Sequence, residues 1–224
     1  MSSNIDSETS IQYAEFSPPV LRKKRKGVRP SLSTLVDQCR KSLKESEWYK
    51  QCEEILLESI PFDRPFEIIC LGLGSPSSSA ISRVQYCFLL NLCDHKPVKV
   101  SLYDPVFTEE DCGLFEEHEL PVSPALTNGA AHLTVYFMPH CDMELYEQVL
   151  KVNGCEQRIR NLVLIGNRLE DYVENKPTRE LQLNAPHILS IVTTLTSKPL
   201  PLSEAWPAAF NNTAVQFLSV GADS

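Results

Sequence analysis

The chain has 224 residues, of which 42% are hydrophobic, so it can bury one substantial core, whereas two full domains would be cramped. It contains no run of about 18 uncharged apolar residues, and its polar N-terminus lacks the apolar core of a signal peptide, which argues against a membrane or secreted protein and predicts a soluble, intracellular one. Eight cysteines occur without a Cys-x-x-Cys pair, so we expect reduced, mostly buried thiols rather than disulfides.

The formal net charge of −8 is unevenly distributed. Residues 1–30 contain six basic and three acidic residues, a balance of +3, which leaves −11 for residues 31–224. Because residues 1–30 are rich in Ser, Pro and charge, we predict a disordered basic tail. Its run Leu-Arg-Lys-Lys-Arg-Lys at 21–26 fits a nuclear-import signal, a nucleic-acid-binding arm or an ordinary solvated flank. The acidic remainder argues against direct nucleic-acid binding.

Residues 31–224 are predicted to form a single domain that begins with a helical extension at 31–61, followed by the core at 62–224. Ser31 or Ser33 can cap the first helix and Ser46 the second, and Pro61 ends the pair. We expect these helices to cover an edge or a face of a sheet.

The core begins with a buried strand, a glycine turn and a helix between residues 66 and 92. Residues 66–71 are apolar apart from Glu67, which is typical of a parallel strand covered on both faces. Gly72 and Gly74 allow a sharp turn, and Ser75 or Ser77 can cap the following helix. The apolar stripe of that helix consists of Ile81, Val84, Cys87, Phe88 and Leu92.

Strands and helices then alternate. We predict strands at 98–103, 133–138, 161–165 and 214–220, and helices at 108–118 and 143–152 capped by Thr108 and Asp142. Residues 187–195 fit a strand or a short helix, and residues 204–210 fit a helical turn. The alternation predicts an α/β fold with a Rossmann-like, mostly parallel sheet and helices on both of its faces.

One candidate binding site lies where the first two predicted strands end. Gly72, Gly74 and Ser75 form the turn after the first strand, and Asp104 follows the second, where a carboxylate can accept hydrogen bonds from ribose hydroxyls. These positions suit a small nucleotide-like or S-adenosylmethionine-like ligand. A structural turn and a helix-capping Asp explain the same residues without a ligand. The third glycine of the dinucleotide fingerprint is replaced by Ser77.

A second candidate cluster follows the strand at 133–138. His140 can serve as an acid or base and Cys141 as a nucleophile, while Asn167, after the next strand, can contact a ligand at the same rim of the sheet. The alternative is a strand-to-helix turn in which His140 hydrogen-bonds the backbone. We predict no metal site, because no His-x-x-His or Cys-x-x-Cys partner occurs.

Several short motifs in this order resemble the sensitivity-to-red-light-reduced family. They are Cys-Leu-Gly-Leu-Gly-Ser at 70–75, Gln-Tyr at 85–86, Leu-Tyr-Asp-Pro at 102–105, Phe-Met-Pro-His-Cys-Asp at 137–142, Leu-Tyr at 145–146, Ile-Gly-Asn at 165–167 and Phe-Asn-Asn-Thr at 210–213. The resemblance runs from about residue 66 to residue 217. It departs from the family after Ile-Gly-Asn, where Arg168-Leu169 replaces the expected Ser and aromatic residue.

The resemblance implies a regulatory protein that acts on circadian clock-gene expression and haem biosynthesis, and we expect it in the cytoplasm and nucleus with protein partners. The candidate crevice at the rim then either senses a metabolite or is vestigial. The resemblance singles out Gly72, Gly74, Asp104, Pro139, His140, Cys141 and Asn167. No cofactor is specified. The alternative is a transferase that uses a nucleotide-like or S-adenosylmethionine-like cofactor, with the glycines on the cofactor, Asp104 on its ribose and His140 as general base.

Overall fold

A computed structural model describes residues 30–96, 98–123 and 133–218 of the chain. The basic tail predicted at residues 1–30 lies outside the described residues except for Pro30, as do the last two residues of the strand predicted at 214–220.

The centre of the molecule is a six-stranded sheet with the order β2-β1-β3-β4-β6-β5. Strands β1 (Phe66–Leu71), β2 (Lys99–Tyr103), β3 (Leu133–Met138) and β4 (Leu162–Asn167) are parallel to one another. The last strand, β6 (Thr213–Leu218), is antiparallel to both β4 and β5 (Leu195–Pro199), between which it lies. The predicted α/β fold with a mostly parallel sheet is confirmed, and β6 is its antiparallel exception.

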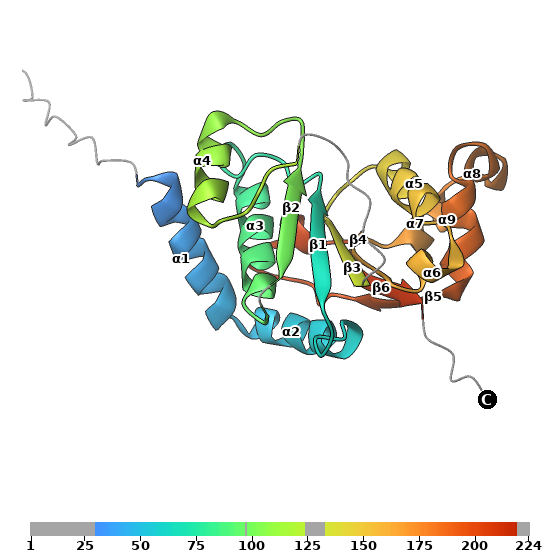
Figure 1. The fold of residues 1–224 in the computed structure, drawn as a ribbon, viewed down its shortest axis with the longest axis horizontal. Helices are drawn as coiled ribbons and strands as arrows, with labels where there is room; N and C mark the ends of the chain where they lie inside the picture. The colour runs from blue at the N-terminus through green and yellow to red at the C-terminus, as the bar shows by residue number, and fades with distance from the viewer. Residues whose placement is uncertain (1–29, 97, 124–132, 219–224) are drawn as a thin grey trace, which may run out of the picture.

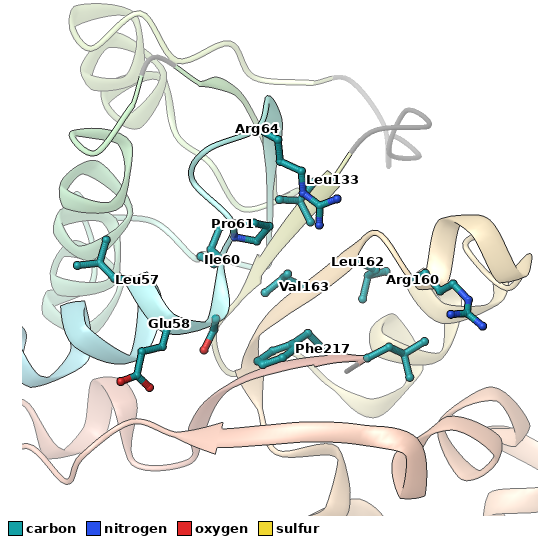
Figure 2. A pocket seen from close by; sticks show the side chains of 12 residues that line it. Leu57, Glu58, Ile60, Pro61, Arg64, Leu133, Arg160, Leu162, Val163 and Phe217 are labelled. Atoms are coloured by element: carbon teal, nitrogen blue, oxygen red, sulfur yellow. The ribbon is translucent and has the colours of Figure 1, made fainter. Parts of the chain in front are cut away.

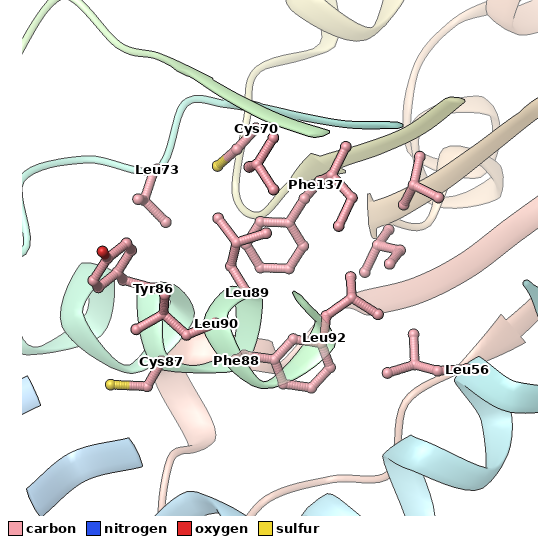
Figure 3. Close-up of a cluster of buried hydrophobic side chains, with 14 of the residues drawn as sticks. Leu56, Cys70, Leu73, Tyr86, Cys87, Phe88, Leu89, Leu90, Leu92 and Phe137 are labelled. Atoms are coloured by element: carbon pink, nitrogen blue, oxygen red, sulfur yellow. The ribbon is translucent and has the colours of Figure 1, made fainter. Parts of the chain in front are cut away.

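Helices cover both faces of the sheet (Figure 1). One face packs against α1 (Leu32–Glu45), α2 (Glu47–Ser59), α3 (Ala80–Cys93) and α10 (Pro207–Phe210) in a core rich in aromatic rings. Figure 3 shows part of this core, in which the ring of Phe88 of α3 packs against that of Phe137 of β3. The other face packs against α5 (Met143–Val152), α7 (Leu169–Asn175), α8 (Thr178–Asn184) and α9 (Pro186–Ile191). Shorter or outer elements are α4 (Glu109–Glu117), α6 (Glu156–Ile159) and the 3-10 turn η1 (Val192–Thr194).

The first two helices belong to the main core. Val36 and Leu43 of α1 and Leu56 of α2 are completely buried. Trp48 of α2 donates from Nε1 to the carbonyl oxygen of Pro201 at 2.7 Å, and its ring lies 4.8 Å from that of Phe210. The chain therefore joins its first helices to the segment before its last strand, where buried aromatic rings contribute strongly to packing.

The cap predicted for α3 is wrong. Neither Ser75 nor Ser77 caps this helix, which begins at Ala80 after Ser79, whose hydroxyl accepts a hydrogen bond from the backbone N–H of Ser82 at 3.2 Å. Residues 75–79 instead form an extra turn, because the two earlier serines bond to each other and to neighbouring groups. Ile81 consequently lies in the first turn of α3 and is 41% exposed, outside the buried stripe predicted for it.

The caps predicted for the other long helices agree with the structure. Ser31, Ser46, Thr108 and Asp142 each accept the backbone N–H three residues later. All eight cysteines lie within the described residues and are free thiols, of which Cys52, Cys70, Cys87 and Cys141 are buried. Across residues 30–96, 98–123 and 133–218, no helix has both the length and the hydropathy needed to cross a bilayer.

Candidate functional site

The glycine turn after β1 is joined to the end of β2. Gly72 and Gly74 have φ angles of 64° and 72°, a left-handed conformation that glycine adopts without steric cost. The N–H of Gly74 donates to Oδ2 of Asp104 at 2.8 Å, and the N–H of Gly72 donates to the carbonyl oxygen of Tyr103 at 3.3 Å. The second oxygen of Asp104 accepts the N–H of Val106 at 3.0 Å. The predicted pairing of glycine turn and carboxylate therefore exists as a direct hydrogen bond.

A buried carboxylate that sequence reasoning missed supports the extra turn. Asp111 is completely buried, and its Oδ1 accepts the N–H of Ser77 at 2.8 Å while its Oδ2 accepts the N–H and hydroxyl of Thr108 at 2.9 and 2.8 Å. Burial alone would raise the pKa of Asp111, but hydrogen bonds from Ser75, Thr108 and Ser77 outweigh it and lower the pKa below its usual value. The spacing of Thr108 and Asp111, which matches a capping box, was the available sequence signal.

His140 holds the turn after β3 against two other segments. Its φ is 57°, which is uncommon for a residue other than glycine. Its backbone N–H donates to Oδ1 of Asn167 at 3.2 Å, and its Nε2 lies 2.9 and 3.1 Å from the carbonyl oxygens of Ala208 and Ala209. Since carbonyl oxygens only accept, the imidazole proton belongs on Nε2.

Cys141 is packed beneath the glycine turn. Its side chain is buried, and Sγ donates to the carbonyl oxygen of Leu71 at 3.3 Å. Burial, followed by the charges of Asp142 and Asp104, raises the pKa of the Cys141 thiol to about 12. A Cβ on Gly72 would collide with the Cys141 sulfur. The thiol is therefore protonated at neutral pH and fills space between β1 and α5.

Asn167 is surrounded by two tyrosines, of which Tyr146 belongs to a motif of the family resemblance and Tyr172 was not singled out in the sequence. The Tyr146 hydroxyl donates to the carbonyl oxygen of Met138 at 2.5 Å and accepts the N–H of Asn167 at 2.7 Å. The Asn167 side-chain amide donates to the carbonyl oxygen of Cys141 at 3.0 Å and to the hydroxyl of Tyr172 at 2.9 Å. Asn167 thus joins the ends of β3 and β4 to α5 and α7.

The predicted site residues converge at one rim of the sheet. Direct contacts connect Gly74 with Asp104, Gly72 with Cys141, and His140 with Asn167, all at the carboxyl ends of β1 to β4. Most of their polar atoms already have partners within the protein, so this rim is a hydrogen-bonded network with no thiolate nucleophile. The part of the chain that the structure describes contains no group of three or more His, Cys, Asp or Glu side chains arranged to hold a metal ion.

A cavity lies at the opposite end of the strands. It has a volume of about 270 Å³ and is lined mainly by apolar side chains from the end of α2 and from β3, β4 and β6. Figure 2 shows Val163 and Phe217 inside it, with the guanidinium groups of Arg64 and Arg160 at its border. None of the predicted site residues contributes to this cavity, because they occupy the carboxyl ends of the same strands.

Comparison with known proteins places these features in a family. An SRR1-like protein of Mus musculus is 28% identical over 130 residues, 55% of this chain and 52% of its own length. An SRR1-like protein of Drosophila melanogaster is 28% identical over 162 residues, 70% of this chain and 57% of its own length. The Arabidopsis thaliana protein SENSITIVITY TO RED LIGHT REDUCED 1 is 25% identical over 166 residues, 70% of this chain and 60% of its own length. The chain thus spans between about half and 60% of these relatives.

A solved structure described as cofactor-bound Rv0187 from MTB is similar at a TM-score of 0.42 and 13% identity, over 87% of this chain and 92% of that one. The SRR1 domain matches residues 39–217, which include all six strands except the last residue of β6 and every residue of the rim network. The resemblance noted in the short motifs is therefore confirmed, and the chain belongs to the SRR1 domain family.

Proposed function

We propose that this chain is a regulatory protein of light signalling that acts in the cytoplasm and nucleus on circadian clock-gene expression and haem biosynthesis. Membership of the SRR1 domain family supports the regulatory role, and the name of the Arabidopsis relative connects that protein with red light. The proposal includes protein partners and a rim that senses a small nucleotide-like ligand through Gly72, Gly74, Ser75, Asp104 and Asn167.

One observation favours a regulatory over a catalytic role, namely that the polar groups at the rim are already hydrogen-bonded within the protein. The Cys141 thiol is buried with a raised pKa, and Nε2 of His140 is engaged by two carbonyl oxygens. The buried Cys141 thiol lacks the exposed, activated state that a nucleophile needs, and the exposed His140 has its Nε2 proton directed at backbone carbonyl oxygens. In contrast, the hydrogen bond between Gly74 and Asp104 joins two turns that a ligand competing for the carboxylate would separate.

The test is rescue of cells depleted of the protein. We expect depletion to change the amplitude of clock-gene transcripts and the level of haem, and wild-type protein to restore both. Asp104→Asn should restore neither, because it weakens the acceptor for the Gly74 N–H, whereas the control Asp63→Asn changes an exposed carboxyl and should restore both. Unchanged transcripts and haem after depletion would contradict the proposal, and a fluorescent fusion excluded from the nucleus would contradict the proposed localisation.

Partner binding is expected to use other surfaces than the His140 turn. His140→Ala and Cys141→Ala should leave the proteins captured by the folded full chain unchanged, as measured by quantitative pull-down. Loss of a partner from either folded variant would mean that the turn itself is the docking surface.

A transferase with a nucleotide-like or S-adenosylmethionine-like cofactor is the second candidate. The observation that favours it is the glycine turn after the internal strand β1, beside a carboxylate that follows the neighbouring β2, since ligands of α/β folds collect at such strand ends. Native mass spectrometry of the purified chain, before and after denaturation, should then reveal a bound small molecule that Asp104→Ala loses. A folded protein without any bound molecule, and without heat of binding to S-adenosylmethionine, favours the regulatory role.

A further inference from the structure

Two cysteine thiols meet between α1 and α3, on the opposite side of α3 from the sheet. Cys39 belongs to α1 and Cys87 to α3, and the two helices pack along each other (Figure 1). In Figure 3 the sulfur of Cys87 points away from Phe137 and Cys70 of the sheet. Its Sγ lies 3.5 Å from the carbonyl oxygen of Val36, which is three residues before Cys39 and therefore on the same face of α1.

The two thiols differ in access and in hydrogen bonding. Cys87 is completely buried, whereas Cys39 is only partly covered. A hydrogen bond from the Cys87 thiol is the main cause that lowers the pKa of Cys39, against the effect of burial, and the charge of Arg83 adds to it. The same contact, together with burial, raises the pKa of Cys87. The pair thus combines an accessible sulfur that favours the thiolate with a buried one that keeps its proton.

The other cysteines lack this combination. Burial raises the pKa of Cys52, Cys70 and Cys141, which are shielded from solvent. Cys93 is partly covered like Cys39, but burial raises its pKa to about 12. Cys155 is exposed and provides an internal reference for an accessible thiol.

We propose that Cys39 and Cys87 are a redox modification site, at which a hydroperoxide oxidises Cys39 and Cys87 then closes a disulfide between α1 and α3. The Cys39 thiolate attacks one peroxide oxygen, the O–O bond breaks, and the sulfur is oxidised to a sulfenic acid while the departing hydroxide or alkoxide takes up a proton. The Cys87 sulfur then attacks the Cys39 sulfur, an S–S bond replaces the S–O bond, and the thiol proton leaves with the hydroxyl as water.

The position of the two cysteines favours formation of the disulfide. The Cys87 sulfur already lies 3.5 Å from the backbone of α1, one helical turn before Cys39, and the two helices are in contact, so an S–S bond of about 2.05 Å requires only a local adjustment. The product would fix α1 to α3, on the opposite face of the sheet from α5 and α7. In a reducing compartment, a disulfide of this kind is transient, which suits a redox signal.

The experiment uses the reduced full chain, treated with hydrogen peroxide, quenched with an alkylating reagent and digested without reductant for peptide mass spectrometry. We expect a peptide pair linked through Cys39 and Cys87, lighter by two hydrogen atoms than the free peptides and separated by dithiothreitol. Cys87→Ser should instead accumulate a sulfenic acid on Cys39 that dimedone labels, Cys39→Ser should give no linked pair, and Cys155→Ser should behave as wild type.

A second measurement needs no variant. Alkylation of the native chain by iodoacetamide at neutral pH should modify Cys39 at least about tenfold faster than Cys93, because the fraction of thiolate sets the rate. Equal rates at the two cysteines, a peroxide-induced link between any other pair, or conversion of Cys39 to a sulfinic acid without a link to Cys87 would overturn the proposal.

Discussion

At the scale of single residues, the rim contains glycines whose positions leave no room for a side chain. Gly166 illustrates this, since an added Cβ would collide with the Tyr146 hydroxyl and lie 2.6 Å from the carbonyl oxygen of Met138. At Gly74 an added Cβ would meet only the hydroxyl of Ser82, but the φ of 72° would strain a residue other than glycine. The requirement for glycine therefore comes from close approach of neighbouring strands and helices as well as from backbone conformation.

Gly72→Ala should destabilise the protein by about 2–4 kcal/mol, because alanine is strained at a φ of 64° and its Cβ would collide with the sulfur of Cys141. Urea denaturation measures the effect. The control is Gly113→Ala, where a Cβ meets nothing within 4 Å and helix propensity predicts a gain of about 0.5–1 kcal/mol. Combining Gly72→Ala with Cys141→Ala should relieve the collision and leave the backbone strain. Equal effects of the two glycine substitutions would contradict this account.

Asp111 should make stability depend on pH in the acid range. Its pKa is lowered in the folded state, so its contribution is present above the unfolded pKa of about 3.9 and is lost as the pH falls through the folded pKa. Asp111→Asn should remove this part of the pH dependence and cost about 1–2 kcal/mol at pH 7, because Thr108 and Ser77 lose a charged acceptor. Denaturation at pH 7 and pH 3 tests both statements. An unchanged slope in Asp111→Asn, matching that of the exposed control Asp63→Asn, would rule them out.

At the scale of elements, the start of α3 decides how the glycine turn is built. The serine run at 77–79 offers several alternative caps, and local sequence alone does not choose among them. The choice is made by Asp111, a residue of another helix, which binds the N–H of Ser77 and thereby moves the helix start to Ala80. Long-range hydrogen bonding thus overrides the first cap that the sequence offers.

Ser79→Ala should therefore cost about 1 kcal/mol in free energy of unfolding, since the Ser82 N–H loses its acceptor. Ser79→Asp should keep the cap and add a favourable charge at the helix N-terminus. Ser77→Ala should cost less than Ser79→Ala, because Ser77 contributes its backbone N–H to Asp111 and its hydroxyl is not the cap. Thermal unfolding of the three variants gives the order, and a larger loss for Ser77→Ala would place the cap where the sequence pattern first suggested.

At the scale of the whole molecule, local sequence patterns predicted most strands and helices. They did not predict the contacts that depend on segments far apart in the chain. The strands β1 to β4 and helices α1 to α5 follow from apolar periodicity and capping residues, and their ends predicted which residues share the rim. The position of β6 between β4 and β5 depends on pairing across the sheet, which no local pattern contains. Likewise, the sequence allowed for a His140 that hydrogen-bonds the backbone, but Tyr146, Tyr172 and the accepting carbonyl oxygens of α10 reach the rim from other segments, so these partners were not predicted.

The position of the first helices in the core leads to a prediction about truncation. A chain that begins at Pro30 should fold with an unfolding temperature within about 2 °C of the full chain, because residues 32–218 contain the buried contacts of both cores. Removal of residues 1–45 should instead expose the partners of Val36 and Leu43, two completely buried side chains, at a cost of several kcal/mol. Calorimetry of both truncations decides the matter. If the chain that begins at Pro30 unfolded as readily as the chain without residues 1–45, residues 1–29 would have to contribute to the folded core. The boundary predicted at residue 31 would then be wrong. If both truncated chains were as stable as the full chain, α1 would contribute nothing to the stability of the core. The contact between Cys39 and Cys87 would then not stabilise the fold.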